Sequence, residues 1–92
     1  MGLSVRKDEG GSRYELVEDD VVVGVAEYRV QGDAVVFHHT LIDSARRGHG
    51  LGAVLVQGAL DDVRRTGHKV VPVCWYVGQF IDTHSGYADL LA

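Results

Sequence analysis

Three glycines at alternate positions, Gly48, Gly50 and Gly52, form the segment of this sequence whose chemistry is easiest to interpret. Glycine has no side chain, so a backbone with glycine at every second position can approach a bound molecule closely. Apolar residues recur from Leu51 at spacings of three and four and predict an amphipathic helix directly after the turn. Its first N–H groups lack partners within the helix and lie at the positive end of the helix dipole. The segment fits a phosphate or pyrophosphate site, while a connector that only turns the chain would show the same glycines.

Three known phosphate-binding patterns can be compared with this turn. A P-loop is excluded because no Gly-Lys-Ser or Gly-Lys-Thr follows the glycines. A dinucleotide fingerprint can be drawn through Gly48, Gly50 and Ala53, but it lacks the acidic residue expected about twenty positions later. The chain is also too short for a doubly wound sheet. The third pattern, Arg/Gln-x-x-Gly-x-Gly/Ala, is matched by Arg47, Gly50 and Gly52.

Two side chains outside the turn could carry proton transfer. Cys74 follows a predicted short strand and begins a predicted helix, whose N-terminus would bring the thiol pKa below about 8.5. The alternative is a small buried hydrophobe, which is the usual state of a lone cysteine. His39 has an ordinary pKa of about 6.5, which suits a base acting on an amine. His38 and His39 face opposite sides of a strand, so only one faces any cleft, and a histidine bonded within the sheet remains an alternative.

Composition and charge limit the class of protein. A chain of 92 residues predicts one domain over residues 1–92. The net charge of −4 argues against a dedicated nucleic-acid-binding protein, and the single cysteine excludes an internal disulfide. We find no signal-peptide pattern and no apolar stretch of about 18 residues, and therefore expect a cytoplasmic protein without membrane association. No histidine or cysteine spacing is typical of a metal site, and we expect none.

The elements that must position these residues follow from the hydrophobic pattern. Strands are predicted at residues 14–17, 21–30, 34–42 and 69–73, with a weaker one at 4–7. Short spacers between the early strands favour antiparallel pairing, and residues 34–73 form a strand–helix–strand unit that can pair in parallel. Pro72 has no N–H to donate, so the last strand is predicted to lie at the edge of the sheet, to contain a bulge or to splay away at its end. A second helix begins near Trp75, and Trp75, Tyr76 and Phe80 are expected in the core. The prediction is a single-domain α+β fold with a mostly antiparallel sheet and two main helices.

Two segments resemble a known family. They are His39-Thr40-Leu41-Ile42 with Arg47-Gly48-His49-Gly50-Leu51-Gly52, and Val71-Pro72-Val73-Cys74-Trp75-Tyr76-Val77 with Phe80-Ile81, His84 and Tyr87-Ala88-Asp89-Leu90. The first resembles the fourth strand and pyrophosphate loop of the Gcn5-related N-acetyltransferases. The second is similar to the C-terminal signature of a minimal single-domain subgroup of that superfamily. Ser85-Gly86 departs from the Pro-Glu pair usual in the subgroup.

This resemblance implies a cofactor, a reaction and a set of site residues. Acetyl-coenzyme A would lie where the two central strands splay apart, with its thioester near Cys74 and His39 as the base. The residues implied in cofactor binding are Leu41, Ile42, Arg47, Gly48, His49, Gly50, Leu51, Gly52 and Phe80. The reaction implied is direct transfer of an acetyl group to an amine, either a small molecule or a protein. The alternative is a non-catalytic acyl-coenzyme A-binding or interaction module.

Overall fold

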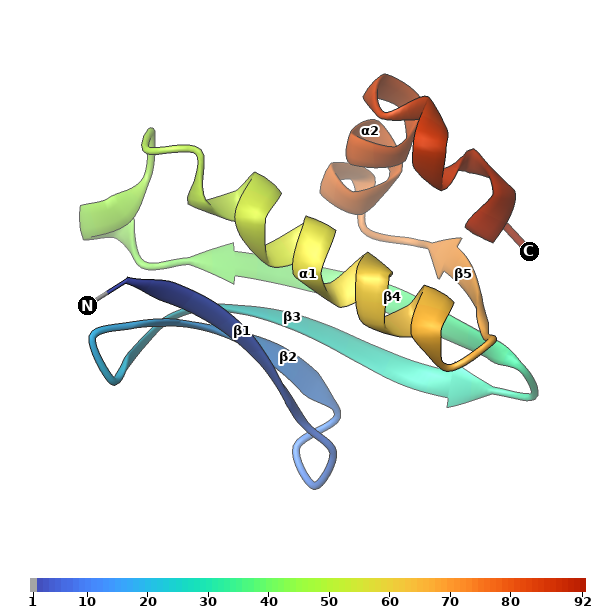
Figure 1. Ribbon diagram of the computed structural model, residues 1–92, viewed down its shortest axis with the longest axis horizontal. Helices are drawn as coiled ribbons and strands as arrows, with labels where there is room; N and C mark the ends of the chain where they lie inside the picture. Colours follow the sequence, from blue (N-terminus) through green and yellow to red (C-terminus); the bar gives the residue numbers. More distant parts are fainter. Residues whose placement is uncertain (1) are drawn as a thin grey trace.

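The computed structural model describes residues 2–92 and consists of one sheet and two helices (Figure 1). The strands follow one another across the sheet in chain order: β1 (Leu3–Asp8), β2 (Arg13–Glu18), β3 (Val21–Gln31), β4 (Ala34–Ile42) and β5 (Lys69–Pro72). The helices are α1 (Leu51–Arg65) and α2 (Trp75–Thr83), with 3₁₀ helices η1 (Ser44–Arg46) and η2 (Ser85–Leu90). The predicted α+β fold, the strand at residues 34–42 and the helix start at Leu51 are confirmed.

Strands β1 to β4 form an antiparallel meander, as the short spacers predicted. All three of its turns contain left-handed residues: Ser12 lies at φ 52°, Asp19 and Asp20 lie at φ 49° and 69°, and Gly32 lies at φ 61°. Two consecutive left-handed residues give the type I′ geometry that matches the twist of a hairpin, and aspartate tolerates this conformation better than most residues. The chain therefore folds back on itself within a few residues at each turn.

The sheet opens between β4 and β5. Parallel pairing joins Ala34–Phe37 to Lys69–Pro72 and stops there, while β4 continues to Ile42 with β3 alone as its partner. Pro72 has no N–H to extend the ladder, and the last link is the Cys74 N–H, which donates to the Phe37 carbonyl at 2.8 Å. The register shifts between Glu27 and Tyr28, so that His38 is an extra residue in β4. The splayed strands implied by the family resemblance are confirmed.

Both helices contribute to one hydrophobic core. Tyr14, Tyr28 and Phe37 form an aromatic cluster with ring centroids 5.4–6.1 Å apart. The remaining buried members of this core come mainly from α1 and α2, and include Leu55, Val56, Ala59, Leu60, Val63, Val77, Phe80 and Ile81. α1 lies across one face of the sheet, and α2 lies beside it above β5 (Figure 1). The opposite sheet face contributes Glu15, Val17 and Val36, which are buried but lie outside this core.

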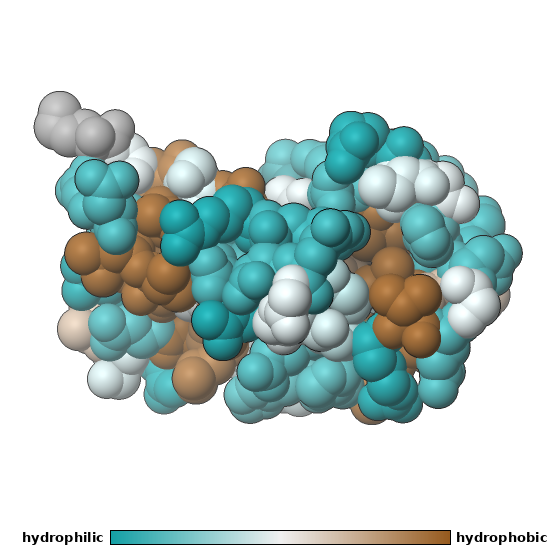
Figure 2. Space-filling model, turned by 90° about the horizontal axis from the view of Figure 1, so that it is seen from below, coloured by the Kyte–Doolittle hydropathy of each residue, from teal (hydrophilic) through white to brown (hydrophobic). Residues whose placement is uncertain are grey.

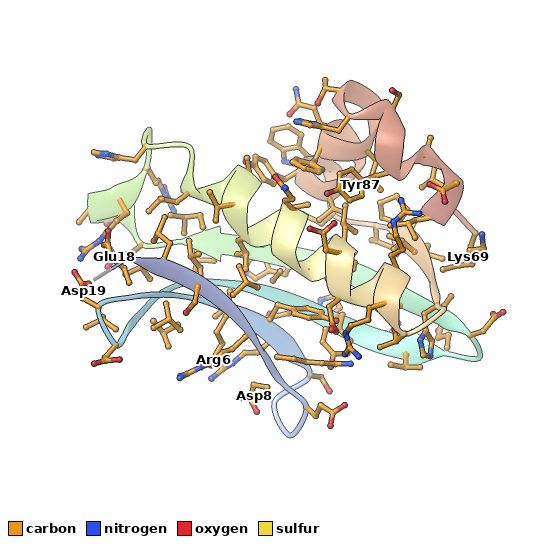
Figure 3. The ribbon with its side chains drawn as sticks, viewed as in Figure 1. Arg6, Asp8, Glu18, Asp19, Lys69 and Tyr87 are labelled. Carbon is orange, nitrogen blue, oxygen red and sulfur yellow. The ribbon has the colours of Figure 1, made fainter. Side chains whose placement is uncertain are left out.

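The end of the chain is fastened to α1 by polar contacts. In Figure 3 Tyr87 extends from η2 toward α1, where its hydroxyl donates to Asp61 Oδ1 at 2.7 Å. The Arg64 guanidinium donates to both oxygens of Asp89, at 2.8 and 3.0 Å. These contacts hold η2 and α2 beside α1, and so help to place the start of α2 near the start of α1. No helix within residues 2–92 has the length and hydrophobicity needed to cross a membrane.

Candidate functional site

A cavity of about 560 Å³ occupies the gap where β4 has lost its parallel partner. It is bordered by the end of β4, by the glycine turn and by the first residues of both helices. Its lining residues are Thr40, Leu41, Ile42, Arg46, Arg47, Gly48, Gly50, Leu51, Gly52, Cys74, Trp75 and Tyr76. The cavity thus joins the two parts of the sequence that carry the family resemblance, although 21 residues lie between Gly52 and Cys74 in the chain.

The glycine turn has a backbone that other residues would strain. Gly48 and Gly50 lie at φ 85° and 74°, where a side chain is unfavourable although nothing lies within 4 Å of an added Cβ. Gly50 is the N-cap of α1 and has no side chain to accept from the first N–H groups of the helix. These donors border the cavity, and the helix dipole adds positive potential there. The turn can therefore hold an anion such as a pyrophosphate.

Two arginines on the cavity rim add positive charge beside the turn. The Arg47 Nε–H donates to the Ile42 carbonyl at 3.2 Å, which folds the side chain back over the end of β4. The Arg46 Nε–H donates to Glu18 Oε1 at 2.9 Å, so a carboxylate of β2 partly neutralises that guanidinium. Arg47 is therefore the arginine better placed to meet an anionic ligand, because the structure gives it no carboxylate partner among residues 2–92.

Gly52 has a different role, because its missing side chain leaves space for a residue of α2. A Cβ at Gly52 would lie 2.5 Å from the Tyr76 hydroxyl oxygen and 2.9 Å from the ring carbon that carries it. The Tyr76 phenol therefore packs directly on the backbone of the first turn of α1. This contact joins the start of α2 to the start of α1 and closes one wall of the cavity.

Cys74 also lines the cavity and is the N-cap of α2. Its half-buried thiol donates to Thr40 Oγ1 at 3.5 Å. Burial raises the pKa of the thiol, but the Thr40 hydroxyl and the backbone N–H groups of Tyr76 and Val77 lower it more, so that the pKa falls below its ordinary value. These two N–H groups are close enough to lower the pKa, but the Cys74 side chain does not form a capping hydrogen bond with α2. The site thus contains a thiol that ionises more readily than a free cysteine.

Most of the predicted cofactor residues line this one cavity. They are Leu41, Ile42, Arg47, Gly48, Gly50, Leu51 and Gly52, and Cys74 joins them. His49 is exposed in the turn and does not line the cavity. Phe80 is 5% exposed in the core and borders a separate pocket of about 170 Å³ behind Tyr76. Roles for His49 and Phe80 in cofactor binding remain predictions.

His39 lies on the other face of β4. Its strand partner is Glu27, whereas the next residue, Thr40, pairs with Ala26 of the core and faces the helices. Side chains alternate along a strand, so the His39 imidazole faces away from the helices. A role as the base therefore requires an amine that approaches through the gap between β4 and β5 or from that outer face.

Four lining residues were not among the predicted site residues: Thr40, Arg46, Trp75 and Tyr76. The prediction of Trp75 as a core residue is wrong, because 73% of its surface is exposed and its ring meets Tyr76 edge-on at 6.0 Å. Trp75 and Tyr76 begin α2 and line the cavity, whereas the next residue, Val77, is buried in the core. Their position beside Cys74 was the available sequence signal. Among residues 2–92, no three histidine, cysteine, aspartate or glutamate side chains are grouped as a metal site requires.

A model of one protein family matches residues 13–90, and its description is GCN5-related N-acetyl-transferase. The chain belongs to this family. No curated protein sequence matches it. Among solved structures, a GCN5-like protein from Staphylococcus aureus has a TM-score of 0.73 at 17% identity, over 98% of this chain and 88% of that one. The ribosomal-protein-S18-alanine N-acetyltransferase from Escherichia coli has a TM-score of 0.61 at 18% identity, over 65% of this chain.

These structural similarities show the Gcn5-related N-acetyltransferase fold. The matched part is 39% of the length of the Escherichia coli enzyme, so this chain corresponds to less than half of that protein. The family and the fold are therefore shown, and the cavity lies where β4 and β5 diverge in this fold. The C-terminal signature around Cys74 stays a resemblance.

Proposed function

We propose that the protein transfers an acetyl group from acetyl-coenzyme A to an amine. The family match and the fold support acetyl transfer. The observation that carries the proposal is that one cavity is lined both by an anion-binding turn and by the Cys74–Thr40 pair. A ligand with a pyrophosphate at one end and a reactive thioester at the other needs such an arrangement.

The residues of the glycine turn would bind the pyrophosphate. Backbone N–H groups from Gly48 to Gly52 and the Arg47 guanidinium supply donors and positive charge. Beyond Phe37 the edge of β4, at Leu41 and Ile42, has no strand partner among residues 2–92 on the side where β5 has ended, and the Ile42 carbonyl accepts from Arg47. The backbone groups of this edge can pair with the amide groups of the pantetheine arm. Acetyl-coenzyme A supplies the acetyl group and carries away its sulfur as the thiol.

Acetyl transfer requires two proton movements. The amine loses a proton as its nitrogen bonds to the acetyl carbon, and the sulfur gains one as its bond to that carbon breaks. His39 is the proposed base because an imidazole accepts a proton near neutral pH. Cys74 is the proposed proton donor to the departing sulfur, since it lines the cavity and its thiol has Thr40 as its hydrogen-bond partner.

Replacement of Cys74 tests the proposal. Cys74→Ala should lower the acetylation rate about 10²- to 10⁴-fold, the usual contribution of a positioned proton donor, with little change in acetyl-coenzyme A affinity. Cys74→Ser keeps a proton donor of higher pKa and should give an intermediate rate. Equal acetylation rates for wild type and Cys74→Ala would show that Cys74 does not donate a proton in the reaction and has only a structural role. A wild type that binds acetyl-coenzyme A but accelerates neither its hydrolysis nor any acetylation would be a binding module.

A further inference from the structure

The face of the sheet opposite the helices has polar side chains that the reaction above does not fully use. Glu27 of β3 and His39 of β4 are direct strand partners on this face. They lie beside the point where β4 loses its pairing with β5. Thr40, the next residue, faces the other way and contacts Cys74 in the cavity. The Glu27–His39 pair is therefore separated from the reacting end of the cavity by little more than the thickness of one strand.

The Glu27 carboxylate has no ion pair or hydrogen bond within residues 2–92, although it is only partly exposed. Its other strand neighbour is Arg13. The Arg13 guanidinium is engaged elsewhere, because its Nη2 lies 2.9 Å from Glu15 Oε2 and its Nε lies 3.5 Å from Asp8 Oδ2. Glu27 thus presents a negative carboxylate without a direct ion pair among these residues next to the imidazole of His39, with the exposed Arg29 two residues away on the same face of β3. This charge complements an ammonium group.

An apolar groove of about 200 Å³ lies on the same two strands, one step along. It is lined by Val22, Val23, Gly24, Val25, Leu41 and Asp43. Val25 and Leu41 are also strand partners, and they lie on the same face as Glu27 and His39, two residues away along each strand. Two residues of a strand span about 7 Å, so the groove begins about 7 Å from the carboxylate. A cavity of about 150 Å³ can hold benzene, and this groove can therefore hold a group of similar size.

Several exposed apolar side chains lie close together at the end of the molecule that contains this groove. Figure 2 shows this apolar surface as a brown region at the end that holds the β2–β3 turn, separated by polar surface from a second apolar region. The exposed apolar side chains at this end include Val21, Val22 and Leu41, which are 55%, 39% and 48% exposed. Apolar side chains left open beside a binding groove gain free energy when a ligand covers them.

We propose that this outer face binds the acetyl acceptor, and that the acceptor is a primary amine with one apolar substituent of about four to eight carbons. The ammonium group binds to Glu27, His39 takes its proton, and the substituent fills the groove at Val25 and Leu41. This inference rests on the proposed acetyltransferase function. The charge and the groove act together, because neither a purely polar amine nor an uncharged apolar molecule would use both.

A series of monoamines of increasing apolar size, with one diamine for comparison, tests the inference. We would measure kcat/KM for ethylamine, 3-methylbutylamine, 2-phenylethylamine and putrescine, following thiol release from acetyl-coenzyme A. Each buried methylene contributes about fourfold, so 3-methylbutylamine should exceed ethylamine by roughly 10- to 60-fold. Putrescine should fall at least about tenfold below 3-methylbutylamine, because its second ammonium would lie in the groove without a partner. Val25→Ala should reduce the difference along the series.

Variants of Glu27 separate this inference from the proposed function. Glu27→Gln should raise the KM for 3-methylbutylamine about 10-fold or more and leave the acetyl-coenzyme A Kd unchanged, and Glu27→Asp should keep part of the affinity. Glu9→Gln makes the same change on the exposed β1–β2 turn and should have no effect. An equal rate across the amines, or an unchanged KM in Glu27→Gln, would overturn the inference and leave the proposed function intact. Acetyl-coenzyme A binding without turnover of any of these amines would also overturn it. Absence of acetyl-coenzyme A binding would overturn the proposed function itself.

Discussion

Gly52→Ala is the substitution whose effect depends most directly on the geometry of the cavity. The new methyl group would lie 2.5 Å from the Tyr76 hydroxyl oxygen and 2.9 Å from the adjoining ring carbon. Side chains do not approach so closely, so the phenol must move. Tyr76 can move because its hydroxyl is the far end of a rotatable side chain at the cavity edge. The ring would then be displaced from the wall that it forms.

The change in stability should be small and the change in affinity large. Alanine favours a helix over glycine by about 1 kcal/mol, while displacement of a partly exposed ring costs a comparable amount. We therefore expect the free energy of unfolding to change by less than about 1 kcal/mol, or less than about 8 °C in Tm. Loss of the Tyr76 wall and the added methyl group should weaken acetyl-coenzyme A binding at least about tenfold, or 1.4 kcal/mol.

Gly58→Ala provides the matched control in the same helix. A Cβ at Gly58 would lie 2.6 Å from Val5 Cγ2 and 2.7 Å from Val5 Cβ, an atom that is fixed to the backbone of β1. This overlap cannot be relieved by rotation alone, so the variant should lose about 1–2 kcal/mol of stability and bind acetyl-coenzyme A normally. Calorimetric titration and thermal unfolding measure both quantities. Normal affinity in Gly52→Ala would refute the argument.

Two further predictions concern individual hydrogen bonds. Thr40→Val removes the hydroxyl that helps to lower the pKa of Cys74, so the thiol pKa should rise and iodoacetamide should alkylate it more slowly at neutral pH; an unchanged pH profile of alkylation would contradict this. Tyr14→Phe removes a 2.6 Å hydrogen bond to Asp62 and should cost about 1 kcal/mol in urea unfolding at pH 7. Burial raises the pKa of Asp62, but hydrogen bonds from Tyr14 and Arg65 bring it below the ordinary value. The stabilisation is therefore present above the ordinary carboxyl pKa and is lost as the pH falls through the lower folded-state value; an equal difference between wild type and Tyr14→Phe at pH 7 and pH 2 would contradict it.

The order of the elements could be predicted from the sequence because it depends on local patterns. The paired aspartates at the β2–β3 turn, the apolar spacing after Leu51 and the proline at the end of β5 each act within a few residues. The same is true of the glycine turn, whose backbone conformation is a property of Gly48 and Gly50 themselves. Patterns of this kind identify where a turn or helix begins, and through the family resemblance they also identified most of the cavity.

The contacts between distant segments could not be predicted in this way. The helical pattern places Asp62 on the solvated face of α1, yet it accepts a hydrogen bond from Tyr14, 48 residues earlier. The requirement for glycine at Gly52 and Gly58 comes from Tyr76 and Val5, which only the folded chain brings near. Trp75 is apolar and was expected in the core, but the chain leaves the sheet at that point and exposes it. Such outcomes depend on tertiary packing, which a periodic pattern does not encode.

Calorimetric titration of the protein with acetyl-coenzyme A tests the central claim most directly, with free coenzyme A for comparison. We expect one molecule bound per chain with micromolar affinity, about −8 kcal/mol, and a rise in Tm as ligand is added. Gly50, at φ 74°, should be essential to this binding, so Gly50→Val should abolish it. No heat and no thermal stabilisation at millimolar ligand would mean that the glycine turn only reverses the chain, and the proposed enzyme activity would have to be abandoned.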